Sequence, residues 1–147
     1  MTLQEQYLKA EKGCFPVSHE AYDQLVVDLA LAIEKSLLKA GKLGFGAAQK
    51  LVNLMMKGLW AWGIIKQKLG VPLHAPVDRR ILSKLKNVPS TWPSWTKAVA
   101  RRKSSKTVTD YRAIQRKLRM HWHESSIKFP SVIRMEQFIW HQIPSRK

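Results

Sequence analysis

The sequence predicts an all-α protein, and three observations support this fold class. Apolar residues recur three and four positions apart along most of the chain, whereas the alternation of a half-buried strand is nearly absent. Capping residues and glycines punctuate these amphipathic stretches. The 147 residues, 45% of them apolar, suffice to bury one core, so we expect a single compact multi-helix domain over residues 1–147.

The first two predicted helices are joined by a short glycine-rich turn. Ser18 is a good N-cap for the first helix, which is expected to end at Gly41. The turn over residues 41–46 then leads into a second helix from Ala47 to Trp62. The apolar side of this second helix is predicted to comprise Leu51, Leu54, Met55, Leu59 and Trp62.

Prolines and capping residues define the middle of the chain. Two prolines kink the connection over residues 70–76, and Asp78 is placed to cap a short helix that reaches Leu85. A turn with proline and tryptophan over residues 89–95 leads into a helix through Val99.

Two longer helices are predicted in the C-terminal part. Residues 101–106 form a basic loop before a helix that starts at Thr109 or Asp110. Pro130 occupies the first position of the last helix, which extends through Ile139.

Positive charge is concentrated in the middle of the chain. The net charge is +16, and residues 35–109 contain sixteen Lys and Arg side chains but a single carboxylate, Asp78. Residues 1–34, in contrast, hold six acidic residues and two lysines. This uneven distribution favours a nucleic-acid partner over a general solubilising charge, which is the alternative.

Several protein classes are excluded by what the sequence lacks. Cys14 is the sole cysteine, so the sequence predicts neither a disulfide framework nor a cysteine-rich metal site, and we expect no metal and no cofactor. There is no signal-peptide pattern and no apolar stretch long enough to cross a bilayer. We therefore expect a cytoplasmic protein of prokaryotic or viral origin without a membrane partner; the nucleus is the alternative.

The turn Gly44-Phe45-Gly46 is a candidate phosphate-binding element. Small residues between two helices leave backbone N–H groups free at the N-terminus of the second helix, where the helix dipole favours an anion. Lys42, Lys50 and Lys57 lie close by in the sequence. The turn is therefore predicted to bind a DNA backbone without reading its sequence, with an ordinary helix connection as the alternative.

Two segments resemble the helix–hairpin–helix DNA glycosylases. Residues 43–50, Leu-Gly-Phe-Gly-Ala-Ala-Gln-Lys, are similar to the family's hairpin, within a hairpin element of about 36–62. Residues 76–82, Pro-Val-Asp-Arg-Arg-Ile-Leu, are similar to the segment that carries the catalytic aspartate. The 28 positions from Lys50 to Asp78 are closest to the spacing in the archaeal 8-oxoguanine glycosylase branch.

The resemblance implies that Asp78 is the catalytic carboxylate and that Lys50 is the nucleophile of a lyase-competent enzyme. In the commonest version of the family the lysine falls two residues after the second hairpin glycine, where this chain has Ala48. Cleavage of an N-glycosidic bond develops positive charge on the sugar, which a buried carboxylate stabilises. Attack by an amine instead forms a Schiff base. The alternative for Asp78 is a helix cap alone, worth ~1 kcal/mol.

Base removal also requires the nucleotide to be extruded and held by stacking. Trp92 and Trp95 lie in a turn without helical periodicity and are candidate stacking residues. Trp62, Trp122 and Trp140 are predicted to be core residues.

The remaining candidates are one histidine and several cations. His74, next to the Pro-Val-Asp segment, is expected to line a pocket, to contact a phosphate or to make a structural hydrogen bond. Arg79 and the loop residues Arg101, Arg102 and Lys103 are candidates to contact the DNA backbone, with a solvated loop as the alternative.

Together these observations predict a DNA glycosylase that flips a damaged or modified base and cleaves its glycosidic bond, with or without lyase activity. The expected partner is DNA, contacted through its backbone and one flipped nucleotide. Two alternatives belong to other classes: a non-catalytic helical DNA-binding module of a larger assembly, and an RNA-binding or ribosome-associated protein.

Overall fold

The protein is helical throughout the part of the chain that the structure describes. This computed structural model describes residues 18–39, 43–64, 73–85 and 97–142, and within these ranges it contains no strand. The helices are α2 (His19–Lys39), α3 (Phe45–Ala61), α4 (Arg79–Lys84), α5 (Lys106–Glu124) and α6 (Val132–His141). The predicted all-α class is therefore confirmed.

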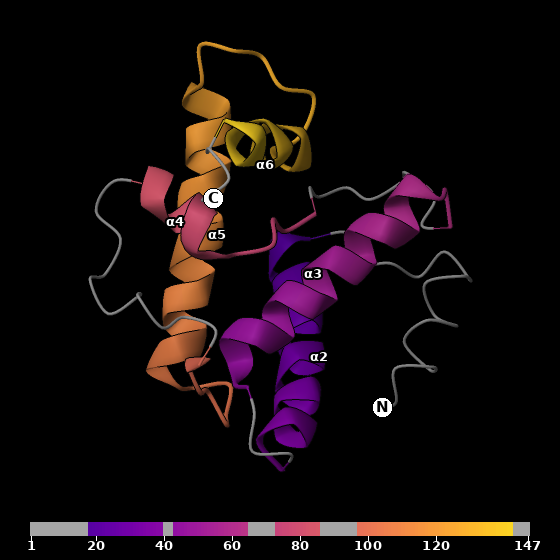
Figure 1. Ribbon diagram of the computed structural model, residues 1–147, viewed down its shortest axis with the longest axis vertical. Helices are drawn as coiled ribbons and strands as arrows, with labels where there is room; N and C mark the ends of the chain where they lie inside the picture. The colour runs from indigo at the N-terminus through magenta and orange to yellow at the C-terminus, as the bar shows by residue number, and fades with distance from the viewer. Residues whose placement is uncertain (1–17, 40–42, 65–72, 86–96, 143–147) are drawn as a thin grey trace, which may run out of the picture.

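The helices pack around one core. α3 crosses α2 obliquely and packs against it, and α6 lies across the C-terminal end of α5 and also contacts α4 (Figure 1). Each helix contributes apolar side chains, and the largest fully buried ones are Tyr22, Phe45, Ile81, Tyr111, Ile114, Leu118 and Met135. The core therefore joins segments from both ends of the described chain.

Side-chain caps fix where the helices begin. Ser18 Oγ accepts a hydrogen bond from the Ala21 N–H at 3.1 Å and caps α2, as predicted. The helix predicted from Thr109 instead begins at Lys106, because Ser105 Oγ accepts from the Val108 N–H at 3.3 Å.

Two further helix starts differ from the prediction. Ser131 caps α6, so Pro130 lies before the cap rather than at the first helical position. α3 begins at Phe45 instead of Ala47, with Gly44 as its N-cap.

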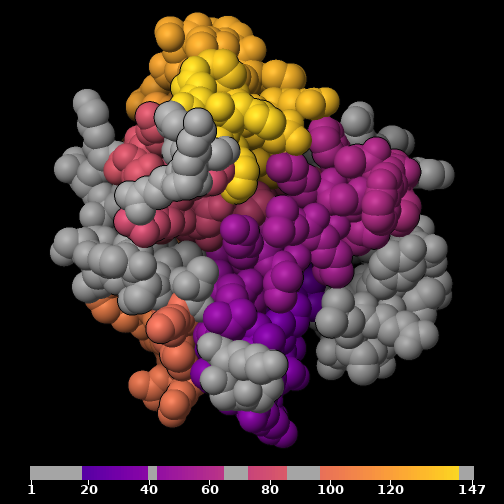
Figure 2. All heavy atoms as spheres, viewed as in Figure 1, coloured from indigo at the N-terminus to yellow at the C-terminus, as the bar shows by residue number. Residues whose placement is uncertain are grey.

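The buried side of α3 is not the predicted one. Leu51, Leu54 and Met55 are exposed, and Trp62 is 77% exposed. Atoms of α3 accordingly form a broad part of the face seen in Figure 2. The side that faces the core instead carries small and polar residues beside a few apolar ones: Phe45, Gly46, Ala47, Ala48, Gln49, Val52, Asn53 and Met56.

The polar residues on this side of α3 have a structural reason. Residues 73–78 are extended and wholly buried, and their backbone groups need hydrogen-bond partners. Gln49 Nε2 donates to the Val77 carbonyl at 2.6 Å, and Gln49 Oε1 accepts from the Val77 N–H at 3.2 Å. Gln115 of α5 does the same for Ala75, at 2.7 and 3.2 Å. Two buried glutamines thus supply the backbone hydrogen bonds that neighbouring strands would supply in a sheet.

Candidate active site around Asp78

Asp78 ends the extended segment and caps α4. Its Oδ1 accepts hydrogen bonds from the backbone N–H groups of Arg80, at 3.0 Å, and Ile81, at 3.1 Å. The residue is only 8% exposed. The predicted cap is therefore confirmed, and it fixes the orientation of the carboxyl group.

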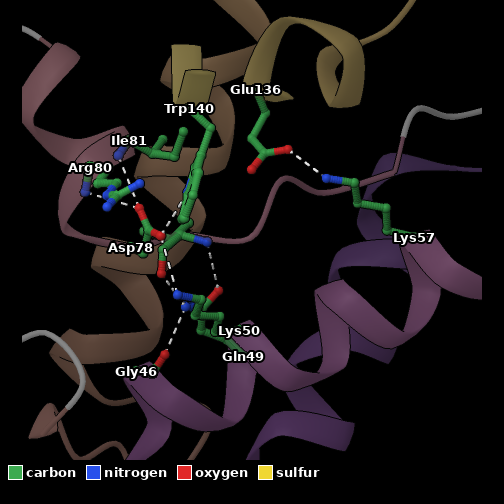
Figure 3. A network of polar contacts seen from close by, with 10 residues as sticks. Gly46, Gln49, Lys50, Lys57, Asp78, Arg80, Ile81, Glu136 and Trp140 are labelled. Carbon is green, nitrogen blue, oxygen red and sulfur yellow. Dashed lines mark hydrogen bonds and ion pairs between the residues drawn. The ribbon is translucent and has the colours of Figure 1, made fainter. Parts of the chain in front are cut away.

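The other oxygen of Asp78 faces two side chains from distant parts of the chain. Lys50 Nζ of α3 lies 3.2 Å from Oδ2, and Trp140 Nε1 of α6 donates to the same atom at 3.0 Å (Figure 3). The structure thus brings together Lys50 and Asp78, the two residues to which the sequence assigned the chemistry.

These contacts set the charge of Asp78. Burial raises its pKa, but the Ile81 N–H, the Trp140 indole and the Lys50 ammonium together outweigh burial and lower the pKa below its usual value. Asp78 is therefore an anion at neutral pH. The side chain of Lys50 is 37% exposed, so solvent reaches part of it.

Trp140 is a site residue rather than the predicted core residue. The residue is 37% exposed, and the guanidinium carbon of Arg80 lies 4.0 Å from the centroid of its ring. The indole N–H needs a polar partner, which Asp78 supplies, so the ring stays at the rim of the core. Trp122 packs against the core as expected, while Trp62 is exposed and was wrongly assigned to it.

A second ion pair lies beside the first. Lys57 Nζ contacts Glu136 Oε2 at 2.9 Å, and Glu136 is 4% exposed (Figure 3). Burial raises the pKa of Glu136 and the negative charge of Asp78 adds to this rise, whereas Lys57 opposes it. Lys57, predicted to contact DNA, is therefore engaged inside the protein.

The hairpin amides are occupied by internal acceptors, which corrects the prediction of a free anion site. The Phe45 N–H donates to Glu34 Oε1 at 3.0 Å, and the Gly46 N–H donates to the Ala98 carbonyl at 3.2 Å. Phe45 and Gly46 are also buried. The buried carboxylate of Glu34 thus takes the place at the N-terminus of α3 that a phosphate was expected to fill.

Glu34 also binds the segment after residue 97. Its two oxygens accept from the backbone N–H groups of Ala100, at 2.6 Å, and Arg101, at 2.7 Å. Gly44 lies so close to this segment that a Cβ atom there would come within 2.4 Å of the Ala98 carbonyl oxygen. Gly44 is therefore required for close packing of the two backbones.

Of the roles predicted for His74, the structure shows the structural hydrogen bond. It is 2% exposed, and its Nδ1 shares a hydrogen bond with the Tyr111 hydroxyl at 2.9 Å. The Tyr111 hydroxyl also accepts from Asn53 Nδ2 at 3.0 Å. Burial lowers the pKa of His74 to about 3, so its ring is neutral in the folded protein.

The remaining predicted residues are dispersed or lie outside the described part. Arg79, Arg101 and Arg102 are exposed, and Lys103 forms an ion pair with Asp28 at 2.7 Å. These side chains are thus at the surface, where the prediction of DNA contacts stays a prediction. The candidates outside the described residues are Lys42, Trp92 and Trp95.

The described residues show neither a metal-binding cluster nor a membrane-spanning helix. No three His, Cys, Asp or Glu side chains gather there in a way that could hold a metal ion. None of the described helices combines the length and the apolar character that crossing a membrane requires.

The residues that the sequence did not reveal are Gln49, Gln115, Glu34 and Trp140. The glutamines and Glu34 lie on helices whose apolar pattern hides them. Trp140 gave one available signal, because an indole N–H near the protein surface requires an acceptor.

Comparison with protein-family models, with curated proteins and with solved structures found no match for this chain.

Proposed function

We propose that this protein is a DNA glycosylase in which Asp78 and Lys50 act on a nucleotide flipped out of the helix. One observation carries the proposal. Lys50 Nζ lies 3.2 Å from Asp78 Oδ2, although the two residues are 28 positions apart, and these are the two residues to which the resemblance assigns the chemistry. The net charge of +16 supports DNA as the substrate.

The chemistry assigns a separate task to each residue. The Asp78 carboxylate, held as an anion, stabilises the positive charge that develops on the deoxyribose as the base leaves with the electrons of the glycosidic bond, and water then bonds to C1′. For strand cleavage, the Lys50 amine first loses a proton and then attacks C1′ of the resulting abasic sugar, from which water leaves as the Schiff base forms; elimination of the 3′ phosphate then breaks the strand. Asp78 Oδ2 is the carboxylate oxygen in contact with that amine and can accept the proton.

The first prediction is that Asp78→Asn abolishes base release. Asparagine keeps an oxygen for the α4 cap, but it removes the negative charge, so we expect single-turnover release to fall by about 10²-fold or more. DNA affinity should change little. The measurement is release of the base from duplexes and single strands that carry oxidised, alkylated, deaminated or hypermodified bases. The matched control is Asp110→Asn, at the ion-pair partner of the exposed Lys106.

Wild-type rates in Asp78→Asn would show that the carboxylate is not catalytic. Release that is lost in both variants would point to damaged folding, so thermal unfolding of both variants accompanies the assay.

The second prediction concerns Lys50. If Lys50 forms a Schiff base, borohydride should trap the wild-type protein covalently on DNA, and Lys50→Gln should lose both the adduct and strand cleavage while keeping base release. Lys106→Gln, at an exposed lysine whose ion-pair partner in the described part of the chain is Asp110, serves as the control. An adduct that persists in Lys50→Gln would assign the nucleophile to another amine.

A non-catalytic DNA-binding module is the second candidate function. Its support is that both oxygens of Asp78 already have two donors each, as a purely structural cap would. This candidate predicts DNA binding that weakens steeply with salt but no base release from any member of the panel.

A further inference from the structure

A cavity between α2 and α5 is lined by three arginines from one side of α5. Its volume is about 480 Å³, and Arg112, Arg116 and Arg119 line it together with residues from the first turns of α2, among them Glu20 and Asp23. The arginines are four and three residues apart, so they leave the helix on the same side. The volume is within the range of small-ligand pockets.

Arg112 and the two carboxylates in this cavity already have partners. Arg112 Nε contacts Asp23 Oδ2 at 2.5 Å, and its Nη2 donates to Gln24 Oε1 at 3.1 Å. The Glu20 carboxylate interacts with its own backbone N–H and with Ser18 at the N-terminus of α2, and both contacts lower its pKa. These charges are therefore engaged within the fold.

Arg116 and Arg119 form no ion pair with any described residue. Burial lowers the pKa of the half-buried Arg119; Asp23 opposes this effect, and the positive charge of Arg116 reinforces it. The two guanidinium groups thus repel one another beside the cavity, and Asp23 and Glu20 offset part of their charge without forming an ion pair with either group.

We propose that Arg116 and Arg119 hold a phosphate group of a nucleic-acid backbone in this cavity. Two planar guanidinium groups offer N–H donors in pairs, which match the oxygens of a phosphate, and the anion would cancel their repulsion. The nucleic-acid source is favoured over free phosphate because a net charge of +16 attracts a polyanion more strongly than a small anion. This proposal rests on the DNA-binding part of the proposed function and is independent of base release.

The test compares the salt dependence of DNA binding in wild type, Arg116→Gln, Arg119→Gln and the double variant. Loss of one phosphate contact should lower the slope of log affinity against log salt by about 0.9 on a duplex, and should weaken binding equally for unrelated sequences. Arg134→Gln is the matched control, since Arg134 is exposed on α6 and bonds Gln137 away from the cavity. Thermal unfolding checks that each variant is folded.

A second measurement uses inorganic phosphate alone. NMR signals of the arginine Nε–H groups should shift for Arg116 and Arg119, and not for Arg134, as phosphate is added. A smaller salt slope in the cavity variants together with these shifts supports the proposal. Shifts with phosphate but an unchanged slope would assign the cavity to a free phosphate ligand and overturn the nucleic-acid assignment. If neither the smaller slope nor the shifts are observed, the proposed phosphate site is overturned. Because no base release is measured, these outcomes stand whether or not Asp78 proves catalytic.

Discussion

At the scale of single residues, Gln49 links the fold to the candidate site. Its amide bonds both backbone groups of Val77, the residue before Asp78, and it also donates to the Gly46 carbonyl at 2.8 Å. Gln49 adjoins Lys50 on α3, so one turn of helix positions both the carboxylate and the amine. The side chain is fully buried and no solvent can replace its hydrogen bonds.

The third prediction is that Gln49→Met destabilises the protein. Methionine has a similar volume but leaves the Val77 N–H and carbonyl unsatisfied, so the free energy of unfolding should fall by about 2–3 kcal/mol. Urea unfolding followed by circular dichroism measures this. The control is Gln137→Met, because Gln137 bonds only the exposed Arg134, and it should change stability by less than about 0.5 kcal/mol. Equal stability of the two variants would refute the role of Gln49.

At the scale of elements, α3 shows what the sequence could and could not predict. Its existence and approximate ends followed from the apolar period and the flanking glycines. Its orientation did not follow, because Leu51, Leu54 and Trp62 suggested a face that the structure leaves exposed. The face of α3 that is buried carries Gln49, because the buried backbone of residues 73–78 needs side-chain hydrogen-bond partners. This requirement arises from tertiary packing, so no local sequence pattern predicts it.

The same reasoning applies to the candidate site. Asp78 was predictable as a cap because Asp before a short helical run has a local signature. Its approach to Lys50 was predictable only through the resemblance, and its contact with Trp140 was missed. The prediction that the hairpin amides are free was wrong, because the carboxyl group of Glu34, ten residues before Gly44, accepts a hydrogen bond from the Phe45 N–H.

The fourth prediction compares Gly44, the N-cap of α3, with Gly58, which lies inside that helix. Gly44→Ala should destabilise the protein by about 2–3 kcal/mol, because its Cβ would come within 2.4 Å of a backbone oxygen. Gly58→Ala should instead stabilise it by about 0.5–1 kcal/mol, because this position is inside the helix and has nothing within 4 Å of the added Cβ. Denaturant unfolding of both variants gives the two signs. If both substitutions changed the free energy of unfolding in the same direction, α3 would not pack against Ala98 as described.

At the scale of the whole molecule, the buried His74 makes the free energy of unfolding depend on pH. The unfolded chain binds a proton at His74 near pH 6.5, but the folded protein binds it only near pH 3. Stability contributed by the neutral ring is therefore present above pH 6.5 and is lost as the pH falls towards 3. The expected loss from this group is about 1.4 kcal/mol per pH unit. Asp23 and Glu136 have raised pKa values and act in the opposite direction.

The fifth prediction is that His74→Gln flattens this dependence. Between pH 6 and about 4, the free energy of unfolding should fall more steeply for wild type than for His74→Gln, because the variant has no ring to protonate. Unfolding in urea at several pH values measures the difference. His121→Gln, at an exposed histidine, should behave as wild type. Parallel curves for wild type and His74→Gln would contradict the assignment.

Oδ2 of Asp78 receives its donors from residues 28 positions before it and 62 positions after it. During synthesis, a nascent chain therefore carries the aspartate and the amine well before the indole has been translated. The carboxylate can acquire its full set of donors only once residue 140 has left the ribosome, so the site matures only after α6 has been synthesised and has packed against α4.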